Sequence, residues 1–224
     1  MMRRRAGGVL LAVLAVVFGC TVWIAGQRDE SVPAGTQRLG PEAGEPVAAY
    51  LRRASASLSL DHSARWALVQ PDSYLTSQRA AELTQGVRVS KVVLRVPLPR
   101  LQTALITRDL PGQQPVAELT GAQQSAAAER LAASRTALDN RHAAVAAAEA
   151  AQLHQGCACV LAVLVFGDGN ALQLVAKRPG ARAVQAALPD TSVEDLAISP
   201  LLPEQSDIAG PVPDDGLPPA PQRP

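Results

Sequence analysis

The chain has 224 residues, of which 47% are hydrophobic and only 3% aromatic, and its 21 basic and 20 acidic residues leave a formal net charge of +1. This length allows one or two domains with a core built mostly from Ala, Val and Leu side chains. The composition excludes a collagenous chain, a disulfide-rich miniprotein and a wholly disordered protein. The balanced charge disfavours nucleic acid as a partner.

An uncharged apolar stretch near the N-terminus predicts a membrane anchor. Arg3, Arg4 and Arg5 are followed by residues 6–26, which include no Asp, Glu, Lys or Arg. As a helix, this stretch would rise about 31 Å, close to the thickness of the hydrocarbon core of a bilayer. Flanking arginines stay in the cytoplasm. We therefore expect a cytoplasmic stub over residues 1–5, a single-pass signal anchor over 6–26, and an extracytoplasmic C-terminal domain at the cell membrane.

Two other interpretations of this segment are a cleaved signal peptide and a lipoprotein. A signal peptide has an apolar core of only about 7–15 residues, whereas the run here continues past Cys20 to Gly26. A lipoprotein would carry its lipid on Cys20; Gly19 fits that pattern, but Phe18 and the apolar residues after Cys20 do not. The length of the run favours the uncleaved anchor.

The basic residues have an unusual distribution. Lysine occurs only at Lys91 and Lys177, so the other 19 basic residues are arginine, and the chain is dense in Ala, Val and Pro. Beyond Arg5 the chain has 18 basic and 20 acidic residues, which makes nucleic acid still less favourable as a partner. In composition and topology the chain resembles the uncharacterised single-pass envelope proteins of actinobacteria. The resemblance involves no specific motif, so it implies a place in the cell envelope and no functional residue.

Two segments lack the pattern of a folded structure. Residues 27–46 are rich in Pro and Gly without an apolar period, which predicts a flexible linker. Residues 199–224 are rich in Pro, with Asp214 and Asp215 between the prolines, which predicts a disordered tail. The folded domain is therefore expected over residues 47–198.

The first half of that domain shows short elements. Helical spacing predicts a helix over 47–58, and 66–69 is a short strand closed by a proline. A helix capped by Thr76 or Ser77 should end before Gly86. Residues 87–96 favour a strand whose alternation slips, so we expect a bulge at Ser90-Lys91 that turns its apolar residues inward. A returning strand should then begin with Leu101, Thr103 and Leu105.

The second half begins with an Ala-rich helix over residues 113–154. Ala fills 14 of the 30 positions from 122 to 151, and we expect a break or kink at Asp139-Asn140. Leu131, Leu138 and Val145 lie seven apart, which suits pairing of two copies. Residues 159–166 form an apolar run typical of a central strand. A helix capped by Asp168 and a strand over 181–187 should follow.

The order of these elements is β-α-β-β-α-β followed by α-β. This order predicts an α+β domain with a ferredoxin-like split β-α-β sandwich and an extra α-β pair, outside the transmembrane helix. A similar spacing of strand, helix, glycine and strand occurs twice, from residue 66 to 89 and from residue 163 to 184. Duplicated β-α-β halves fit the same sandwich.

The sequence contains no G-x-S-x-G elbow, H-E-x-x-H helix, P-loop or G-x-G-x-x-G motif. We therefore predict no enzyme, no catalytic residue and no cofactor. The sharpest local feature is Cys157 and Cys159 with His154 nearby. Three interpretations stay open: two buried thiols, a disulfide, or a metal site that uses all three residues. On a strand the two Cα atoms would lie about 6.6 Å apart, so a disulfide would need a tighter backbone.

A group of basic residues is the only candidate binding surface. With the bulge in place, several cations of the 87–109 region should point away from the core. They are Arg88, Lys91, Arg95, Arg100 and Arg108. Near a membrane such a patch would meet anionic headgroups, cell-wall polymers or an acidic partner, or it would simply protect a sheet edge.

These observations predict a membrane-anchored extracytoplasmic interaction protein of the cell envelope. We expect it to dock a protein partner or a second copy, through its open sheet face or through helix 113–154. The alternative function is a ligand- or metal-binding, sensing module that uses Cys157 and Cys159. An enzyme would need a cluster of convergent polar residues that the sequence does not display.

Overall fold

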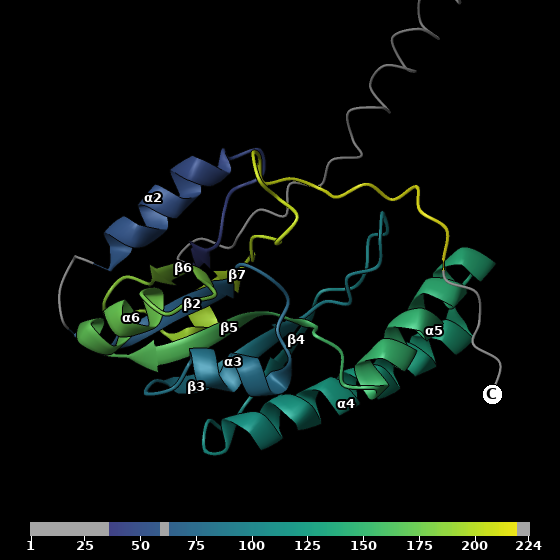
Figure 1. The fold of residues 1–224 in the computed structure, drawn as a ribbon, viewed down its shortest axis with the longest axis horizontal. Helices are drawn as coiled ribbons and strands as arrows, with labels where there is room; N and C mark the ends of the chain where they lie inside the picture. Colours follow the sequence, from purple (N-terminus) through teal and green to yellow (C-terminus); the bar gives the residue numbers. More distant parts are fainter. Residues whose placement is uncertain (1–35, 59–62, 219–224) are drawn as a thin grey trace, which may run out of the picture. The chain divides into compact units, whose positions relative to one another are not determined.

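The structure, a computed structural model, describes residues 36–58 and 63–218. In these residues a five-stranded antiparallel sheet combines with five α-helices, which confirms the predicted α+β class. From one edge to the other the strands are β4 (Ile106–Asp109), β3 (Arg88–Leu94), β5 (Val160–Gly167), β2 (Arg65–Pro71) and β6 (Ala181–Ala186) (Figure 1). The 159–166 run is thus the central strand, as predicted.

The predicted membrane anchor is not among the described residues. The stub 1–5, the segment 6–26 and Cys20 all lie outside them. Within residues 36–58 and 63–218, none of the helices combines the length and the apolar character that crossing a membrane requires.

Two β-α-β units make up the middle of the sheet. α3 (Ser77–Leu83) connects β2 to β3, and α6 (Gly169–Ala176) connects β5 to β6. β5 lies between β2 and β3, and β2 lies between β5 and β6, so a strand of each unit splits the other. The two segments with similar spacing in the sequence are these two units.

The helix ends of both units follow the predicted local signals. The side chain of Thr76 accepts a hydrogen bond from the N–H of Arg79, and Asp168 accepts one from Ala171. These bonds satisfy donors that the first helical turn leaves free. Gly86 ends the first connection with a φ of +86°, a left-handed conformation that favours glycine.

The bulge in β3 is also confirmed. The register of β3 against β5 shifts between Val89 and Lys91, so Ser90 is the extra residue. As a result Val89, Val92 and Leu94 all enter the core. A strict alternation would have turned Val92 and Leu94 to the opposite face.

The two faces of the sheet are covered differently. Valines such as Val69 and Val163 pack with α3, α6 and α4 (Pro115–Thr136). On the opposite face, Leu68 and Leu164 pack against Leu39 in a small parallel sheet formed by β1 (Gln37–Leu39) and β7 (Leu196–Ile198). The turn η1 (Val193–Asp195) leads into β7, and α2 (Val47–Ser57) packs along β6 with Tyr50 buried.

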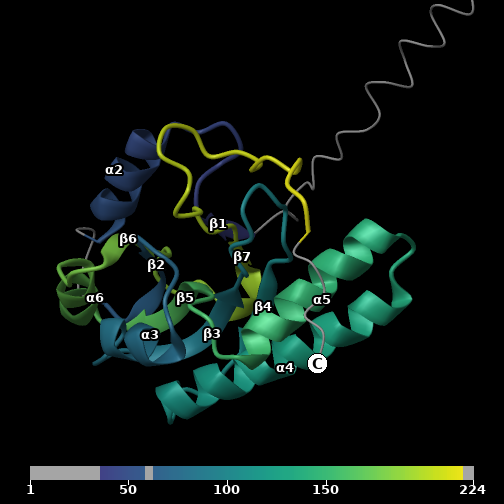
Figure 2. The same ribbon diagram turned by 45° about the vertical axis from the view of Figure 1, so that its right-hand side comes forward.

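The segment 113–154 is not one helix. α4 ends at Thr136 and α5 (Asn140–His154) folds back along it, because Asp139 caps α5 by accepting a hydrogen bond from His142 N–H. Figures 1 and 2 show the two helices side by side, with their connection away from the sheet. The predicted break is therefore a complete reversal, and we call α4 and α5 the helical hairpin.

The reversal removes the predicted heptad stripe. Leu131 lies on α4, Leu138 lies in the connection and Val145 is buried on α5. Since antiparallel helices carry these residues, they form no continuous surface for pairing two copies.

The expected strand start at Leu101 is wrong. β4 begins at Ile106, and Leu105 is exposed. The preceding residues make other hydrogen bonds: Thr103 donates its hydroxyl to the carbonyl of Val96 at 2.6 Å, and Ala104 donates its N–H to Glu149. These contacts hold residues 97–105 as a loop against the hairpin.

The expected boundaries of the domain are too narrow. β1 lies in the predicted linker 27–46, and Leu39 is fully buried. Residues 199–218 of the predicted disordered tail also lie on the domain, where Leu201 and Ala209 are buried. Prolines exclude these residues from the main sheet, but they leave carbonyls and side chains free to bind the domain.

Candidate functional site

A polar cleft of about 220 Å³ lies where the loop 97–105, the helical hairpin and the C-terminal segment meet. Figure 2 shows the yellow C-terminal segment running from the side of α2 toward the hairpin. Several charged and polar residues line the cleft: Gln102, Arg130, Arg141, His142, Glu149 and Asp214.

Glu149 forms the floor of this cleft. Its side chain is almost fully buried on α5, where one carboxylate oxygen accepts the N–H of Ala104 at 2.7 Å. The other oxygen accepts Nε of Arg130 on α4 at 2.6 Å. A buried carboxylate needs such partners, because an unpaired charge in the interior is strongly disfavoured. Glu149 thus joins both helices of the hairpin to the loop 97–105.

The C-terminal segment supplies a carboxylate to the rim of the cleft. One oxygen of Asp214 accepts the backbone N–H of Gln102 at 2.9 Å and a guanidinium N–H of Arg141 at 3.0 Å. The hydrogen bond from Gln102, followed by that from Arg141, holds the pKa of Asp214 below its ordinary value. The rim is thus a binding site for a carboxylate.

A second carboxylate of the same segment binds beside the first. Arg100 binds Asp215 with two N–H groups, and the Nε–Oδ1 distance is 2.7 Å. The N–H of Gly216 then donates to the carbonyl of Arg100 at 2.8 Å. The hydrogen bond from Arg100 lowers the pKa of the Asp215 carboxyl. Paired N–H groups of one guanidinium match the geometry of one carboxylate.

A more apolar groove of about 360 Å³ adjoins this site. It is lined by Leu98 and Leu101, by prolines of the 97–101 loop, and by Val212 and Pro213 of the C-terminal segment. At one end of the groove, Arg95 donates to Glu204 at 2.6 Å and to the hydroxyl of Tyr74. Burial raises the pKa of Tyr74 to about 12, so its hydroxyl keeps its proton and donates to Glu204.

The C-terminal segment divides into two parts. We call residues 199–210 the anchor, because Leu201 and Ala209 are buried and Arg182 donates to the carbonyls of Leu202 and Pro203. We call residues 211–218 the tip, in which every residue is exposed or half-buried.

The predicted basic surface is not a free patch. Arg95 is only 3% exposed and forms the ion pair with Glu204, so it does not point away from the domain. Its guanidinium is buried beside the hydroxyl of Tyr74 and the carbonyl of Leu101. A buried cation needs an anionic partner, which is why Arg95 turns toward Glu204.

The other four predicted cations also have partners. Arg88 lies over the rings of Phe166 on the neighbouring strand β5 and of Trp66 on the next strand, β2. The remaining pairs are Lys91–Asp109, Arg108–Glu129 and Arg100–Asp215. Of the five, Arg95 and Arg100 line the apolar groove beside the polar cleft, and each binds a carboxylate of the C-terminal segment.

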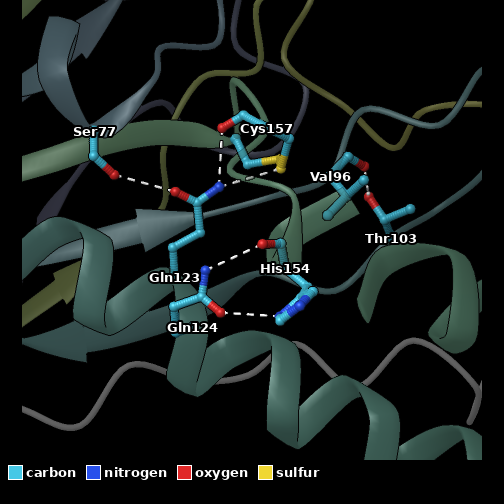
Figure 3. Close-up of a disulfide and its surroundings, with 8 residues drawn as sticks. Ser77, Val96, Thr103, Gln123, Gln124, His154 and Cys157 are labelled. Carbon is cyan, nitrogen blue, oxygen red and sulfur yellow. Dashed lines mark hydrogen bonds between the residues drawn. A yellow bond between two sulfur atoms is a disulfide. The ribbon is translucent and has the colours of Figure 1, made fainter. Parts of the chain in front are cut away.

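Cys157 and Cys159 are joined by a disulfide in the structure, with their Cα atoms 5.3 Å apart. They lie in the turn between α5 and β5 and not on an extended strand, which explains the short separation. Figure 3 shows Gln123 beside this turn; its amide donates to the carbonyl of Cys157 at 2.9 Å and accepts from the hydroxyl of Ser77 at 3.1 Å. The disulfide turn is thereby connected to α3 and α4.

The geometry gives the metal interpretation no support. Both sulfur atoms are used in the disulfide, whereas a metal binds thiolates. His154 faces Gln124, with Nδ1 3.2 Å from the amide oxygen (Figure 3). Among residues 36–58 and 63–218, no group of three or more His, Cys, Asp and Glu residues is arranged to hold a metal ion.

A third groove, of about 450 Å³, lies between α3 and the turn after α6. Its charged residues are occupied with each other or with the backbone: Arg79 binds Glu82, and Arg178 donates to the carbonyl of Leu83 at 2.7 Å. In the polar cleft, by contrast, Arg141 is paired with Asp214 of the tip, which has no buried residue, so we take the polar cleft as the candidate site.

Most residues of the cleft were not predicted from the sequence. Gln102, Arg130, Arg141 and Glu149 lie in an Ala-rich helical segment or a Pro-rich loop, where polar residues usually face solvent. One signal was present: Asp214 and Asp215 are adjacent carboxylates in an otherwise uncharged stretch, and Arg100 lies in a loop between prolines.

Comparison with protein families, with curated proteins and with solved structures finds no match for the chain. Its function is therefore inferred from its own residues. What the cleft region can do chemically is bind carboxylates on an extended chain, with guanidinium and backbone N–H donors.

Proposed function

We propose that the chain is a membrane-anchored extracytoplasmic interaction protein of the cell envelope, which binds a protein partner through the side of its domain that carries the helical hairpin. The uncharged segment 6–26 after three arginines supports the membrane anchor and the cytoplasmic orientation of the N-terminus. A membrane attachment of this kind keeps the domain near other envelope proteins, where a modest affinity is sufficient for binding.

The fold of the domain we assign to the ferredoxin-like sandwiches. Supporting this assignment, the two split β-α-β units give the strand order β6-β2-β5-β3, and α3 and α6 pack on one face. β4 and the helical hairpin are then an insertion between the two units, at the place where this sandwich has a simple hairpin connection. In this assignment α6 and β6, which the element order suggested as an extra pair, are part of the sandwich. The Ala-rich helices α4 and α5 are the addition instead.

The observation that carries the proposed function is the exposure of leucines at the outer end of this insertion. Leu131 is 44% exposed on α4, and Leu138 is fully exposed in the connection. The first turns of α4 are different, since Leu119 and Ala126 are buried in the core. The outer end of the hairpin thus extends beyond the sheet it packs on and presents apolar side chains to the surroundings.

Crosslinking in cells tests this proposal. The full-length protein is compared with a Leu131→Ser/Leu138→Ser variant and with a matched Leu174→Ser/Leu188→Ser variant, whose leucines are exposed elsewhere on the domain. After crosslinking, the protein is purified in detergent and its crosslinked peptides are identified by mass spectrometry. We expect a reproducible protein partner that the hairpin variant loses and the control variant keeps.

Four results would change this conclusion. A partner that both variants retain would move the interface away from the hairpin. Crosslinks only between copies of the chain, mapping to the hairpin, would make the protein a homo-oligomer. If residues 1–26 fail to hold the protein in the membrane fraction, the proposed membrane anchor is wrong. With no crosslinks at all, the ligand-binding alternative at Cys157 and Cys159 would be tested next by Cys→Ser substitution.

A further inference from the structure

The tip is held by an unusually complete set of hydrogen bonds for an exposed segment. Arg141 donates to the carbonyls of Asp214 and Gly216, each at 2.7 Å, and Gln102 donates its amide to the carbonyl of Val212 at 3.0 Å. Together with the bonds to both carboxylates, these contacts mean that Arg100, Gln102 and Arg141 bind both the backbone and the side chains of the tip. Such contacts are typical of the recognition of an extended peptide.

The surface that binds the tip is shaped for it. A Cβ atom at Gly216 would lie 2.5 Å from the carbonyl oxygen of Pro99 and 2.7 Å from that of Arg100, so only glycine fits at this position. Arg100 itself has a φ of +54°, in the left-handed region that a side chain disfavours. Such strain is concentrated at ligand clamps, where neighbouring contacts maintain it.

The tip is nevertheless bound weakly. Its ion pairs are open to solvent: Arg100 and Asp215 are each 62% exposed, and no residue of the tip is buried. Exposed ion pairs of this kind contribute little to stability. A weak site can still be filled in cis, because the anchor keeps the tip at an effective concentration in the millimolar range. A ligand with the same carboxylates and a larger apolar contact would therefore replace it.

We propose that Arg100, Gln102 and Arg141 form a receptor for an extended acidic segment of a protein partner, and that the tip is its internal competitor. The ligand has two adjacent carboxylates followed by glycine, as the tip does. This inference rests on the proposed function, since it names the chemistry of the partner.

The neighbouring apolar groove determines which type of residue the ligand should carry before its two carboxylates. Val212 and Pro213 line this groove of about 360 Å³ without filling it, and Leu98 and Leu101 form part of its wall. A partner segment with a large apolar side chain at the position of Val212 would fill the groove and gain affinity over the tip. The receptor therefore favours an apolar residue, then the acidic pair, then glycine.

Peptide binding to the full-length protein in detergent tests the receptor. The probe is a fluorescent peptide with the sequence of residues 210–218, and fluorescence anisotropy measures its affinity. A Gly216→Ala variant, whose added methyl expels the tip, is compared with a matched Gly210→Ala variant, where a Cβ meets no atom within 4 Å. We expect the peptide to bind the Gly216→Ala protein at least about fivefold more tightly than the wild type or the Gly210→Ala protein.

Two further arms check the chemistry. Adding Arg141→Ala to the Gly216→Ala protein should abolish binding, as should Asp→Asn at both acidic positions of the peptide. A peptide with Val212→Phe should bind more tightly than the original, by roughly fivefold or more. Circular dichroism establishes that the variants are folded. Equal binding to the wild type and the Gly216→Ala protein, or binding that survives Arg141→Ala, would overturn the inference.

The source of the acidic segment is decided separately. If crosslinks in cells join the tip of one copy to the Arg100 loop of another, the ligand is a second copy and the proposal of a different partner is wrong. If a partner is captured that depends on Leu131 and Leu138 but is insensitive to Arg100→Ala/Arg141→Ala, the receptor fails and the proposed function stands. If the peptide binds as expected and no partner is captured, the proposed function fails instead.

Discussion

The anchor and the tip of the C-terminal segment have similar compositions but different relations to the domain. Both are rich in proline, both carry acidic residues, and both are bound by arginines. The anchor places Leu201 in an apolar cluster with Tyr50 and α2, whereas the tip buries no residue and is held by hydrogen bonds and ion pairs beside the apolar groove. The difference teaches that a few apolar side chains decide whether such a segment is part of the fold or a displaceable ligand.

The largest difference in stability is expected between a leucine substitution in the anchor and one in the tip. Leu201→Ala should lower the free energy of unfolding by about 2–5 kcal/mol, because it leaves a cavity in a packed cluster where Leu201 is 1% exposed. Leu217→Ala, at an 89% exposed position of the tip, should leave stability unchanged. Thermal unfolding of the two variants measures both. Equal losses would show that the tip belongs to the fold as firmly as the anchor.

A smaller effect is expected from the two ion pairs. Glu204→Ala in the anchor removes the carboxylate that neutralises buried Arg95, which should cost about 1–3 kcal/mol. The hydroxyl of Tyr74 and the carbonyl of Leu101 remain as partners of Arg95 and limit the loss. Asp215→Ala in the tip breaks a pair that solvent already surrounds. Denaturant unfolding should distinguish the first variant from wild type and not the second.

The smallest effect is the release of the tip by acid. The pKa values of Asp214 and Asp215 are both lowered in the folded chain, from an ordinary value of 3.8. The contribution of these carboxylates is therefore fully present above that ordinary value and is lost as the pH falls through the lowered values. Arg100 and Arg141 pair with the two groups, and His142 also lowers the pKa of Asp214, so the residues that face the tip favour the ionised carboxylates.

The measurement for this prediction is NMR on isotopically labelled protein. The amide signals of residues 211–218 should keep their docked positions from pH 7 down to about pH 4 and shift only at lower pH. Signals of the anchor around Leu201 serve as the control for general unfolding. Release of the tip near neutral pH would mean that its carboxylates are not what binds it.

Much of the β-α-β framework could be predicted from local signals. Thr76 and Asp168 cap their helices, Ser90 is the bulged residue of β3, and Asp139 begins α5, because each depends on interactions within a few residues of the chain. The repeated spacing of strand, helix, glycine and strand marked the two β-α-β units. The candidate site could not be predicted, since Arg100, Arg141 and Asp214 come from three distant segments.

The errors have a common cause. Proline content predicted that 199–218 would be disordered, and the continuity of alanines predicted one helix over 113–154. Both rules describe what the backbone favours when nothing packs on it. In the structure Leu201 and Ala209 find apolar partners, and Glu149 and Arg130 pair two helices that small side chains allow to approach closely.

By itself the sequence determined the class of fold, the positions of most helices and strands, the caps and bulge that place them, and the expectation of a membrane anchor. These follow from periodicity and from hydrogen bonds between near neighbours. Only the tertiary structure decided that residues 36–46 and 199–218 belong to the domain, that the long helix reverses, and that Arg100 and Arg141 bind the chain's own carboxylates. Contacts between distant residues depend on where the fold places them, and a burial or an ion pair of this kind leaves little local pattern.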